Sequence, residues 1–160
     1  MNFHLNKSWI SKLLIAITIS IVLVLIINNA QAQETYTITG DISFQHDGDI
    51  YIRICTMEEW AEFLKPNYEL SVPPWKMIRM NSETKKTGKV SFKLDSIPKG
   101  TYVIVAFQDI IKNQKVDYEG MYMKEPWSTY KEDDYLGNRP RWDIVKFNLE
   151  KNIEGIKIKL

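Results

Sequence analysis

Four oxygen-bearing side chains follow one another in a polar stretch of the chain, at Asp109, Asn113, Asp117 and Glu119. Carboxylate and amide oxygens are the ligands that calcium takes in proteins, so this stretch could hold a Ca²⁺ ion. Known calcium loops place their oxygens more densely and contain a glycine, whereas Ile111 occupies a ligand position here and no glycine comes before Gly120. The alternative is that Asp109 and Asp117 cap turns by accepting backbone N–H groups. We expect no cofactor, with calcium as the alternative.

Aromatic side chains gather just downstream, at Trp127, Tyr130, Tyr135 and Trp142, with Glu125 close by in the sequence. Rings of this kind can stack on a sugar face while a carboxylate accepts its hydroxyls, so the group could bind carbohydrate or peptide. Trp127 and Tyr130 are the members that we expect to be exposed. The alternative is that the rings close one end of a hydrophobic core, because aromatic side chains dominate core energetics in small domains.

Groups suited to catalysis are scarcer. Glu125 with Asp133 or Asp134 could form the carboxylate pair of a glycosidase, but spacing within a loop fixes no distance between them. Cys55 lies in an alternating apolar stretch, where we expect a small buried hydrophobe, and a nucleophile would have only His46 as its base. Neither a Ser-His-Asp set nor a zinc site can be recognised. We therefore expect no enzyme activity and keep a hydrolase as the third hypothesis.

The first residues have the pattern of an export signal. Lys7 and Lys12 precede an apolar run at 13–27, and Ala30-Gln31-Ala32 forms an Ala-x-Ala cleavage site. A signal peptide over residues 1–32 is predicted, hence a secreted or periplasmic protein. The alternative is a retained membrane anchor, because the run is only slightly shorter than the ~20 residues that span a bilayer. With a single cysteine the exported domain has no internal disulfide, so a hydrophobic core must hold it together.

The charge balance bears on possible partners. The 160 residues contain 21 Lys and Arg against 20 Asp and Glu, a formal net charge of +1, and loss of Lys7 and Lys12 with the signal turns it to −1. Acidic and basic residues are interspersed, so we expect no nucleic-acid partner. A carbohydrate or another envelope protein is the expected partner, and no membrane contact is expected once the signal is cleaved.

Alternation of apolar and polar residues predicts strands through most of the mature chain. The alternating stretches are 35–44, 50–54, 75–80, 89–94, 101–109, 143–149 and 155–160. The first two are expected to pair as an antiparallel hairpin, with Gly40 as a bulge or point of close packing. The stretch 101–109 is apolar on both faces, which indicates a central strand.

Two segments depart from this alternation. Thr56 and Glu59 form a capping-box pattern ahead of apolar residues at helical spacing, which predicts a short helix in which Trp60 plugs the core. Residues 110–141 show no sustained period, and loops of this length are functional or disordered. Their aromatic content argues against disorder, so we expect the segment to pack across one end or face of the sheet.

Several segments together carry a family resemblance: Pro98-Lys-Gly-Thr-Tyr-Val-Ile-Val-Ala-Phe-Gln-Asp109, Lys115-Val-Asp117, Gly120, Glu125-Pro-Trp127 and Gly137-Asn-Arg-Pro-Arg-Trp142. In these segments the chain resembles the secreted bacterial proteins of the domain of unknown function 2141. The resemblance covers nearly all of the mature chain and is specific from about Ile97 to Phe147. It implies an exported immunoglobulin-like or transthyretin-like sandwich and no established activity. Where that family has His-Asp-x-Asn, this chain has Gln108-Asp109-Ile110-Ile111, and the proline of the family's Gly-x-Pro is missing after Gly120.

The predicted fold is therefore an all-β domain over residues 33–160. We expect an antiparallel β-sandwich of about seven strands, immunoglobulin-like or transthyretin-like, with one short helical insertion after the second strand. The expected function is a non-catalytic binding or structural module of the cell envelope. The alternative is a calcium-dependent or carbohydrate-binding module that uses the loop from Asp109 to Trp142.

Overall fold

The computed structural model of the chain describes residues 12, 15–20, 33–65, 68–70, 75–119, 122–131 and 140–160. The chain divides into two units, Met1–Gln33 and Glu34–Leu160. In the first unit Lys12 and residues 15–20 are helical, and most of the predicted signal peptide, 1–32, lies outside the described residues. No helix within the described ranges is both long and apolar enough to cross a bilayer.

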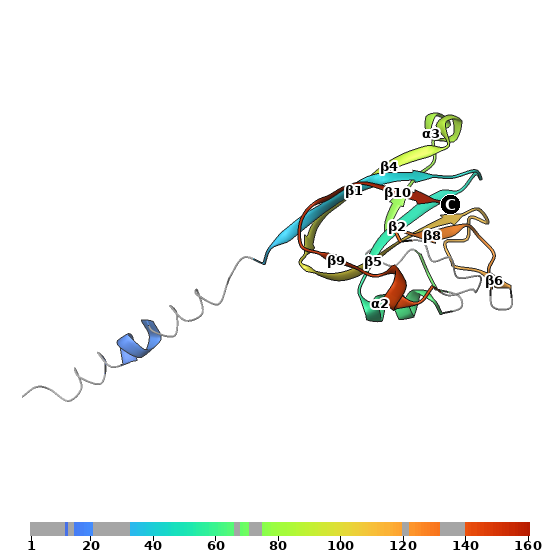
Figure 1. Cartoon of the computed structure of the whole chain (residues 1–160). Helices are drawn as coiled ribbons and strands as arrows, with labels where there is room; N and C mark the ends of the chain where they lie inside the picture. The colour runs from blue at the N-terminus through green and yellow to red at the C-terminus, as the bar shows by residue number, and fades with distance from the viewer. Residues whose placement is uncertain are drawn as a thin grey trace, which may run out of the picture. The chain divides into compact units, whose positions relative to one another are not determined.

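The second unit is built mainly from strands, shown from cyan to red in Figure 1. Its described residues form strands β1 (Thr35–Ser43), β2 (Asp49–Cys55), β3 (Lys76–Ile78), β4 (Lys89–Pro98), β5 (Gly100–Asp109), β6 (Tyr118–Glu119), β7 (Tyr122–Met123), β8 (Trp127–Thr129), β9 (Phe147–Leu149) and β10 (Ile153–Lys159). Three short helices lie between them, α2 (Met57–Phe63), α3 (Ser82–Thr87) and α4 (Trp142–Val145).

Two main sheets share a hydrophobic core. The smaller sheet has the order β10-β1-β4, and the larger has the order β3-β2-β5-β8 with β9 also paired to β5. Side chains of both sheets form the inner core, which consists of Ile38, Ile42, Phe44, Ile50, Ile52, Phe92, Leu94, Ile104, Ala106, Phe147, Leu149, Ile156 and Ile158. Apolar surface buried between two sheets is the defining feature of a β-sandwich, so the predicted all-β fold is confirmed.

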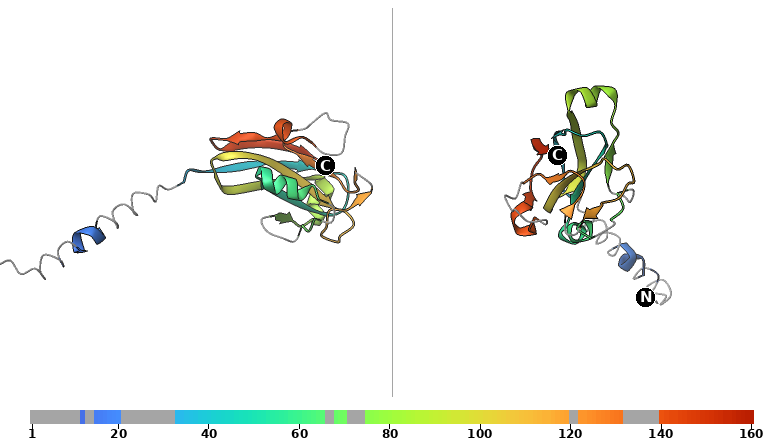
Figure 2. Two further views of the ribbon diagram at one scale, coloured as in Figure 1. Left: turned by 90° about the horizontal axis from the view of Figure 1, so that it is seen from below. Right: turned by 90° about the vertical axis from the view of Figure 1, so that its right-hand side faces the viewer.

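A second core covers the other face of the larger sheet. This outer core consists of Tyr51, Cys55, Trp60, Phe63, Leu70, Val103, Val105, Phe107, Val116 and Val145. Helix α2 supplies Trp60 and Phe63 to it, and the helix lies against the sheet in both views of Figure 2. Because β5 has one face in each core, it is buried on both sides, as predicted for a central strand.

The expected hairpin of the first two strands is wrong. Strand β1 pairs with β4 and β10, whereas β2 pairs with β3 and β5, so β1 and β2 lie in different sheets. The isoleucines of both strands face the inner core, but they face it from opposite sides. Alternation of apolar and polar residues identifies the buried face of a strand but does not specify the strand with which it pairs. Two successive strands therefore have the same sequence pattern whether they form a hairpin or lie in different sheets.

The sheets also contain one parallel pair. Strand β1 runs parallel to β10, with Gly40 opposite Ile156 and Ile42 opposite Ile158, while the other strand pairs of the described residues are antiparallel. The register shifts between Ile38 and Gly40, and a Cβ added at Gly40 would overlap the carbonyl oxygen of Ile156. The prediction of a bulge or close approach at this glycine is confirmed.

The predicted capping box begins α2. The Thr56 hydroxyl accepts the N–H of Glu59, and the Glu59 carboxylate accepts the N–H of Thr56. Helices α3 and α4 were not predicted. Asn81 caps α3, and Gly88 ends it in the left-handed conformation at φ 62°. Helix α4 occupies the first part of the predicted strand 143–149, so β9 is limited to its last three residues.

Candidate functional site

The end of β5 is polar and buried. Its last two residues, Gln108 and Asp109, are almost fully enclosed although the rest of the strand's buried residues are apolar. The Gln108 Nε2 donates to the carbonyl oxygens of His46 at 2.7 Å and Gly48 at 3.3 Å. One buried amide therefore fixes the turn between β1 and β2 against the end of β5. This role of Gln108 was not predicted, although a glutamine and an aspartate at the end of an apolar strand were a signal for it.

Asp109 organises the chain that follows β5. Its Oδ1 accepts the N–H groups of Lys112 at 2.6 Å and Asn113 at 3.1 Å, and its Oδ2 accepts the N–H of Gln114 at 2.9 Å. The side chain is 2% exposed. A buried carboxylate needs donors to replace water, and three backbone N–H groups supply them here. This is the turn-capping arrangement that was the alternative to calcium ligation.

The loop at 110–116 has a strained backbone. Lys112 and Gln114 adopt positive φ angles of 64° and 59°, and Ser96 is the third non-glycine residue with positive φ among those described. Such conformations cost free energy and persist where surrounding contacts over-determine them. Besides the Asp109 bonds, the Gln114 carbonyl accepts the N–H of Leu70 at 2.9 Å, and Val116 donates to the Tyr68 carbonyl at 2.8 Å. The 110–116 loop is thus held from several directions.

Glu125 lies in the interior beside this loop. Its Oε1 accepts the N–H of Ile111 at 2.8 Å, and its side chain is only 2% exposed. Burial raises the pKa of the Glu125 carboxyl group, and the negative charges of Asp109 and Asp117 raise it further; the backbone N–H groups of Ile111 and Ile110 offset part of this rise. Glu125 was predicted, together with the aromatic residues, to accept sugar hydroxyls; in the structure it faces the protein interior.

The other oxygen-bearing residues considered for calcium are Asn113, Asp117 and Glu119. Asn113 donates from Nδ2 to Asp117 Oδ2 at 2.6 Å and accepts the N–H of Lys115, while Glu119 is exposed on β6. Among the described residues, no group of three or more His, Cys, Asp and Glu side chains is placed to hold a metal ion. A calcium ion at Asp109 would have to compete with the three N–H groups already bound there.

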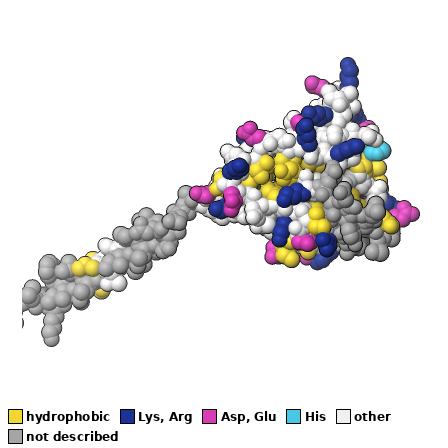
Figure 3. All heavy atoms as spheres, viewed as in Figure 1, with side chains coloured by type: hydrophobic (Ala, Val, Ile, Leu, Met, Phe, Trp, Pro, Cys, Tyr) yellow, Lys and Arg dark blue, Asp and Glu magenta, His cyan; other side chains and the backbone are white. Residues whose placement is uncertain are grey.

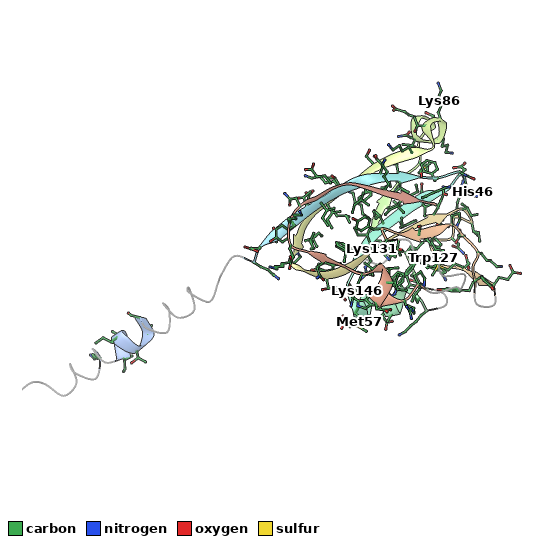
Figure 4. The ribbon with its side chains drawn as sticks, viewed as in Figure 1. His46, Met57, Lys86, Trp127, Lys131 and Lys146 are labelled. Atoms are coloured by element: carbon green, nitrogen blue, oxygen red, sulfur yellow. The ribbon has the colours of Figure 1, made fainter. Side chains whose placement is uncertain are left out.

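The aromatic residues divide between the two cores. The ring of Trp127 packs in the outer core against Trp60 and Phe63, with ring centroids 6.2 Å and 6.1 Å apart. Tyr130 meets Phe147 edge-on, with ring centroids 5.4 Å apart, at the inner core. Trp142 is half-buried against the outer core, and Tyr135 lies outside the described residues. Trp127, labelled in Figure 4, and Tyr130 remain partly exposed, although they belong to different cores.

Other reactive groups are either enclosed or not described. The thiol of Cys55 is buried in the outer core, and burial raises its pKa to about 12, so it carries almost no thiolate at neutral pH. Asp133 and Asp134, the partners considered for a glycosidase pair with Glu125, lie outside the described residues. Arg53 is buried as well: it pairs with Glu59 and donates to the Tyr68 hydroxyl at 2.6 Å, which ties α2 to β2.

The surface charges are dispersed. On the face shown in Figure 3, the described Lys and Arg side chains are scattered among acidic and uncharged ones. Ion pairs on the described surface join single neighbours, such as Lys85 with Asp47 and Lys89 with Asp41. Phosphate backbones are bound by clustered positive charge, and the absence of a nucleic-acid partner stays a prediction.

Comparison with known proteins identifies a family. A family model described as "Uncharacterized protein conserved in bacteria (DUF2141)" matches residues 43–157. No curated protein and no solved structure matches the chain. The matched range runs from the end of β1 into β10 and contains Gln108, Asp109 and the 110–116 loop.

Proposed function

The chain belongs to the DUF2141 family of uncharacterised bacterial proteins. We propose that this protein is an exported, non-catalytic binding module of the cell envelope. The observation that carries the proposal is the strained 110–116 loop, fixed from inside by Asp109 and Glu125. Strained backbone that is held by buried side chains is concentrated at sites where proteins bind or switch.

The side chains of this loop support binding rather than catalysis. The two buried carboxylates at the end of β5 accept backbone N–H groups, so they position the loop and are not presented to a substrate. In contrast, the side chains at 111–115 are all exposed, and Ile111 is 51% exposed. A loop that is already ordered loses little conformational entropy when a partner binds, which favours affinity. Ile111 would be the apolar anchor, with Lys112 and Lys115 beside it, on a surface suited to another protein of the envelope.

Site-specific photo-crosslinking in the living bacterium tests this proposal. A photoreactive residue replaces Ile111 in one variant and Lys86 in the control; Lys86 is equally exposed but lies on α3, at the tip labelled in Figure 4. We expect a discrete cross-linked species from position 111 and none from position 86. Absence of a product at 111, or the same products at both positions, would count against a binding role of the loop.

Carbohydrate binding is the second candidate function, supported by the partial exposure of Trp127 and Tyr130. The direct test is a glycan array probed with the wild-type protein and with Trp127→Ala, after circular dichroism has shown that the variant is folded. Loss of a glycan signal on substitution supports the candidate. Binding that persists in Trp127→Ala removes this residue from the role.

A further inference from the structure

Glu125 uses one carboxyl oxygen and leaves the other without a partner. Oε1 accepts the N–H of Ile111, whereas Oε2 is enclosed and forms no hydrogen bond with the residues that the structure describes. As part of an ionised carboxylate, this oxygen would hold negative charge in the interior with no donor to stabilise it, a costly arrangement. A neutral carboxyl group in the same place carries no net charge, and its desolvation costs far less. The geometry therefore favours the protonated form of Glu125.

The charged groups that face Glu125 act in the same direction. Asp109 at the end of β5 and Asp117 ahead of β6 are the charged groups whose fields act on it, and both are acidic. The lysines of the loop, Lys112 and Lys115, are exposed to solvent. None of the ion pairs formed by the described residues includes Glu125. Ionisation would thus place a third negative charge beside two others without a cation to balance it.

We propose that Glu125 is a proton-operated latch on the 110–116 loop. With its proton, the side chain stays inside and holds the N–H of Ile111, which keeps the start of the loop against the end of β5. When the proton passes to solvent, the carboxylate turns outward to become hydrated and Ile111 is released. The far end of the loop stays attached, because Val116 is buried and donates to the Tyr68 carbonyl. The latch rests on the burial of Glu125, its unpaired oxygen and the acidic groups beside it, and it does not depend on what the loop binds.

The direction of the pH effect follows from linkage. The folded protein holds the Glu125 proton more tightly than the unfolded chain, since the pKa is raised by folding. The resulting stabilisation is fully present below the ordinary pKa of a glutamate and is lost as the pH rises through the raised pKa of the folded state. The loop is therefore closed in acidic surroundings and loosened towards neutral and alkaline pH.

Melting temperatures of the wild type and of Glu125→Gln, measured from about pH 4 to about pH 8, give the first test. Glutamine copies the shape and neutrality of the protonated group, and all other titrating groups are common to both proteins, so their difference isolates Glu125. We expect the melting temperature of Glu125→Gln to increase relative to that of the wild type as the pH rises. The total increase should be about 5 °C for each tenfold by which folding strengthens the binding of the Glu125 proton. A difference that is constant across this range overturns the proposal.

Hydrogen exchange measured in the same two proteins locates the effect. The protection factor at Ile111 should fall with rising pH in the wild type relative to Glu125→Gln, while that of Val116 stays equal in both. Parallel pH dependence at Ile111 in the two proteins contradicts the latch. If the variant does not fold, an NMR titration of the Glu125 side chain in the wild type decides: a pKa at or below that of an ordinary glutamate refutes the proposal, and a raised one supports it.

Discussion

Asp109 shows how far one buried carboxylate can determine the path of a loop. Its two oxygens bind three consecutive backbone N–H groups, and two of the residues concerned, Lys112 and Gln114, have positive φ. Without these bonds, the free energy that the strained angles cost would favour another conformation. The buried Asp109 side chain therefore determines the conformation of an exposed loop.

Replacement of Asp109 by alanine should destabilise the protein strongly. Three N–H groups lose a charged acceptor in the interior, so we expect the free energy of unfolding to fall by about 3 kcal/mol or more, measured by denaturant unfolding. Asp117→Ala is the matched control, because among the described residues this half-buried side chain accepts only from the Asn113 amide; its expected cost is about 1 kcal/mol or less. Equal losses in the two variants would show that Asp109 does not organise the loop.

Cys55 should be unreactive in the folded protein. Its pKa of about 12 leaves almost no thiolate at neutral pH, and the side chain is buried. We expect a thiol reagent such as 5,5′-dithiobis(2-nitrobenzoate) to modify it only after a denaturant is added. Rapid modification under native conditions would contradict this and would reopen the question of a cysteine nucleophile.

Calcium should leave the melting temperature unchanged. The oxygens of Asp109 already accept three N–H groups, and a bound ion would have to displace them. Since any ligand that binds the folded state raises the melting temperature by mass action, a thermal-shift series with millimolar calcium and with EDTA is decisive. A rise with calcium that EDTA reverses would establish the site that the sequence offered as an alternative.

At the scale of elements, local patterns were predicted well and long-range pairing was not. The capping box at Thr56 and Glu59 involves residues three apart, so the sequence contains all of it, and α2 begins where predicted. The partners of β1 lie far along the chain, in β4 and β10, and no local pattern specifies them. This is why the predicted hairpin was wrong although both strands were recognised.

In the candidate site, too, the features that depend on contacts between distant residues were not predicted. Asp109 was recognised as a turn-capping or metal-binding residue from its position at the end of an apolar strand. The inward orientation of Glu125 could not be predicted, because it depends on a hydrogen bond from the N–H of Ile111, a residue fourteen positions away in the sequence. Likewise, composition shows that Trp127 and Tyr130 are aromatic, but only the packed structure assigns them to different cores.

Close packing of β1 against β10 predicts the effect of a single methyl group. In Gly40→Ala the new Cβ would overlap the Ile156 carbonyl, and backbone must move to admit it. We expect a loss of more than about 2 kcal/mol in the free energy of unfolding. Gly155→Ala is the control on the same pair of strands: its φ of 72° is strained for alanine, but no atom lies within 4 Å, so about 1 kcal/mol is expected. A smaller loss at Gly40 than at Gly155 would contradict the tight pairing.

In the molecule as a whole, β5 lies between the inner and the outer core and contributes residues to both. Ile104 and Ala106 face the inner core, while Val103, Val105 and Phe107 face the outer one. This strand is therefore buried on both faces. The loop that follows it is attached to a packed part of the sheet, which is the arrangement expected where a loop must keep its shape.

Export predicts a defined N-terminus for the mature protein. Cleavage after Ala32 would leave Gln33 and Glu34 ahead of β1, and the Glu34 carbonyl accepts the N–H of Lys99 at 3.1 Å, so the cut would spare every strand. N-terminal sequencing of the protein from the bacterial envelope should therefore begin at Gln33. Recovery of the intact N-terminus in the membrane fraction would instead establish the retained anchor.

The parallel pairing of β1 with β10 has a consequence for the order in which the domain can form. Among the described residues, β1 is the first strand along the chain and β10 is the last, so one edge of β1 stays unpaired until β10 has been synthesised. An open edge of this kind can pair with another chain. Folding of the three-stranded sheet is thus coupled to synthesis of β10, and a chain interrupted before Ile153 would present β1 as a site for aggregation.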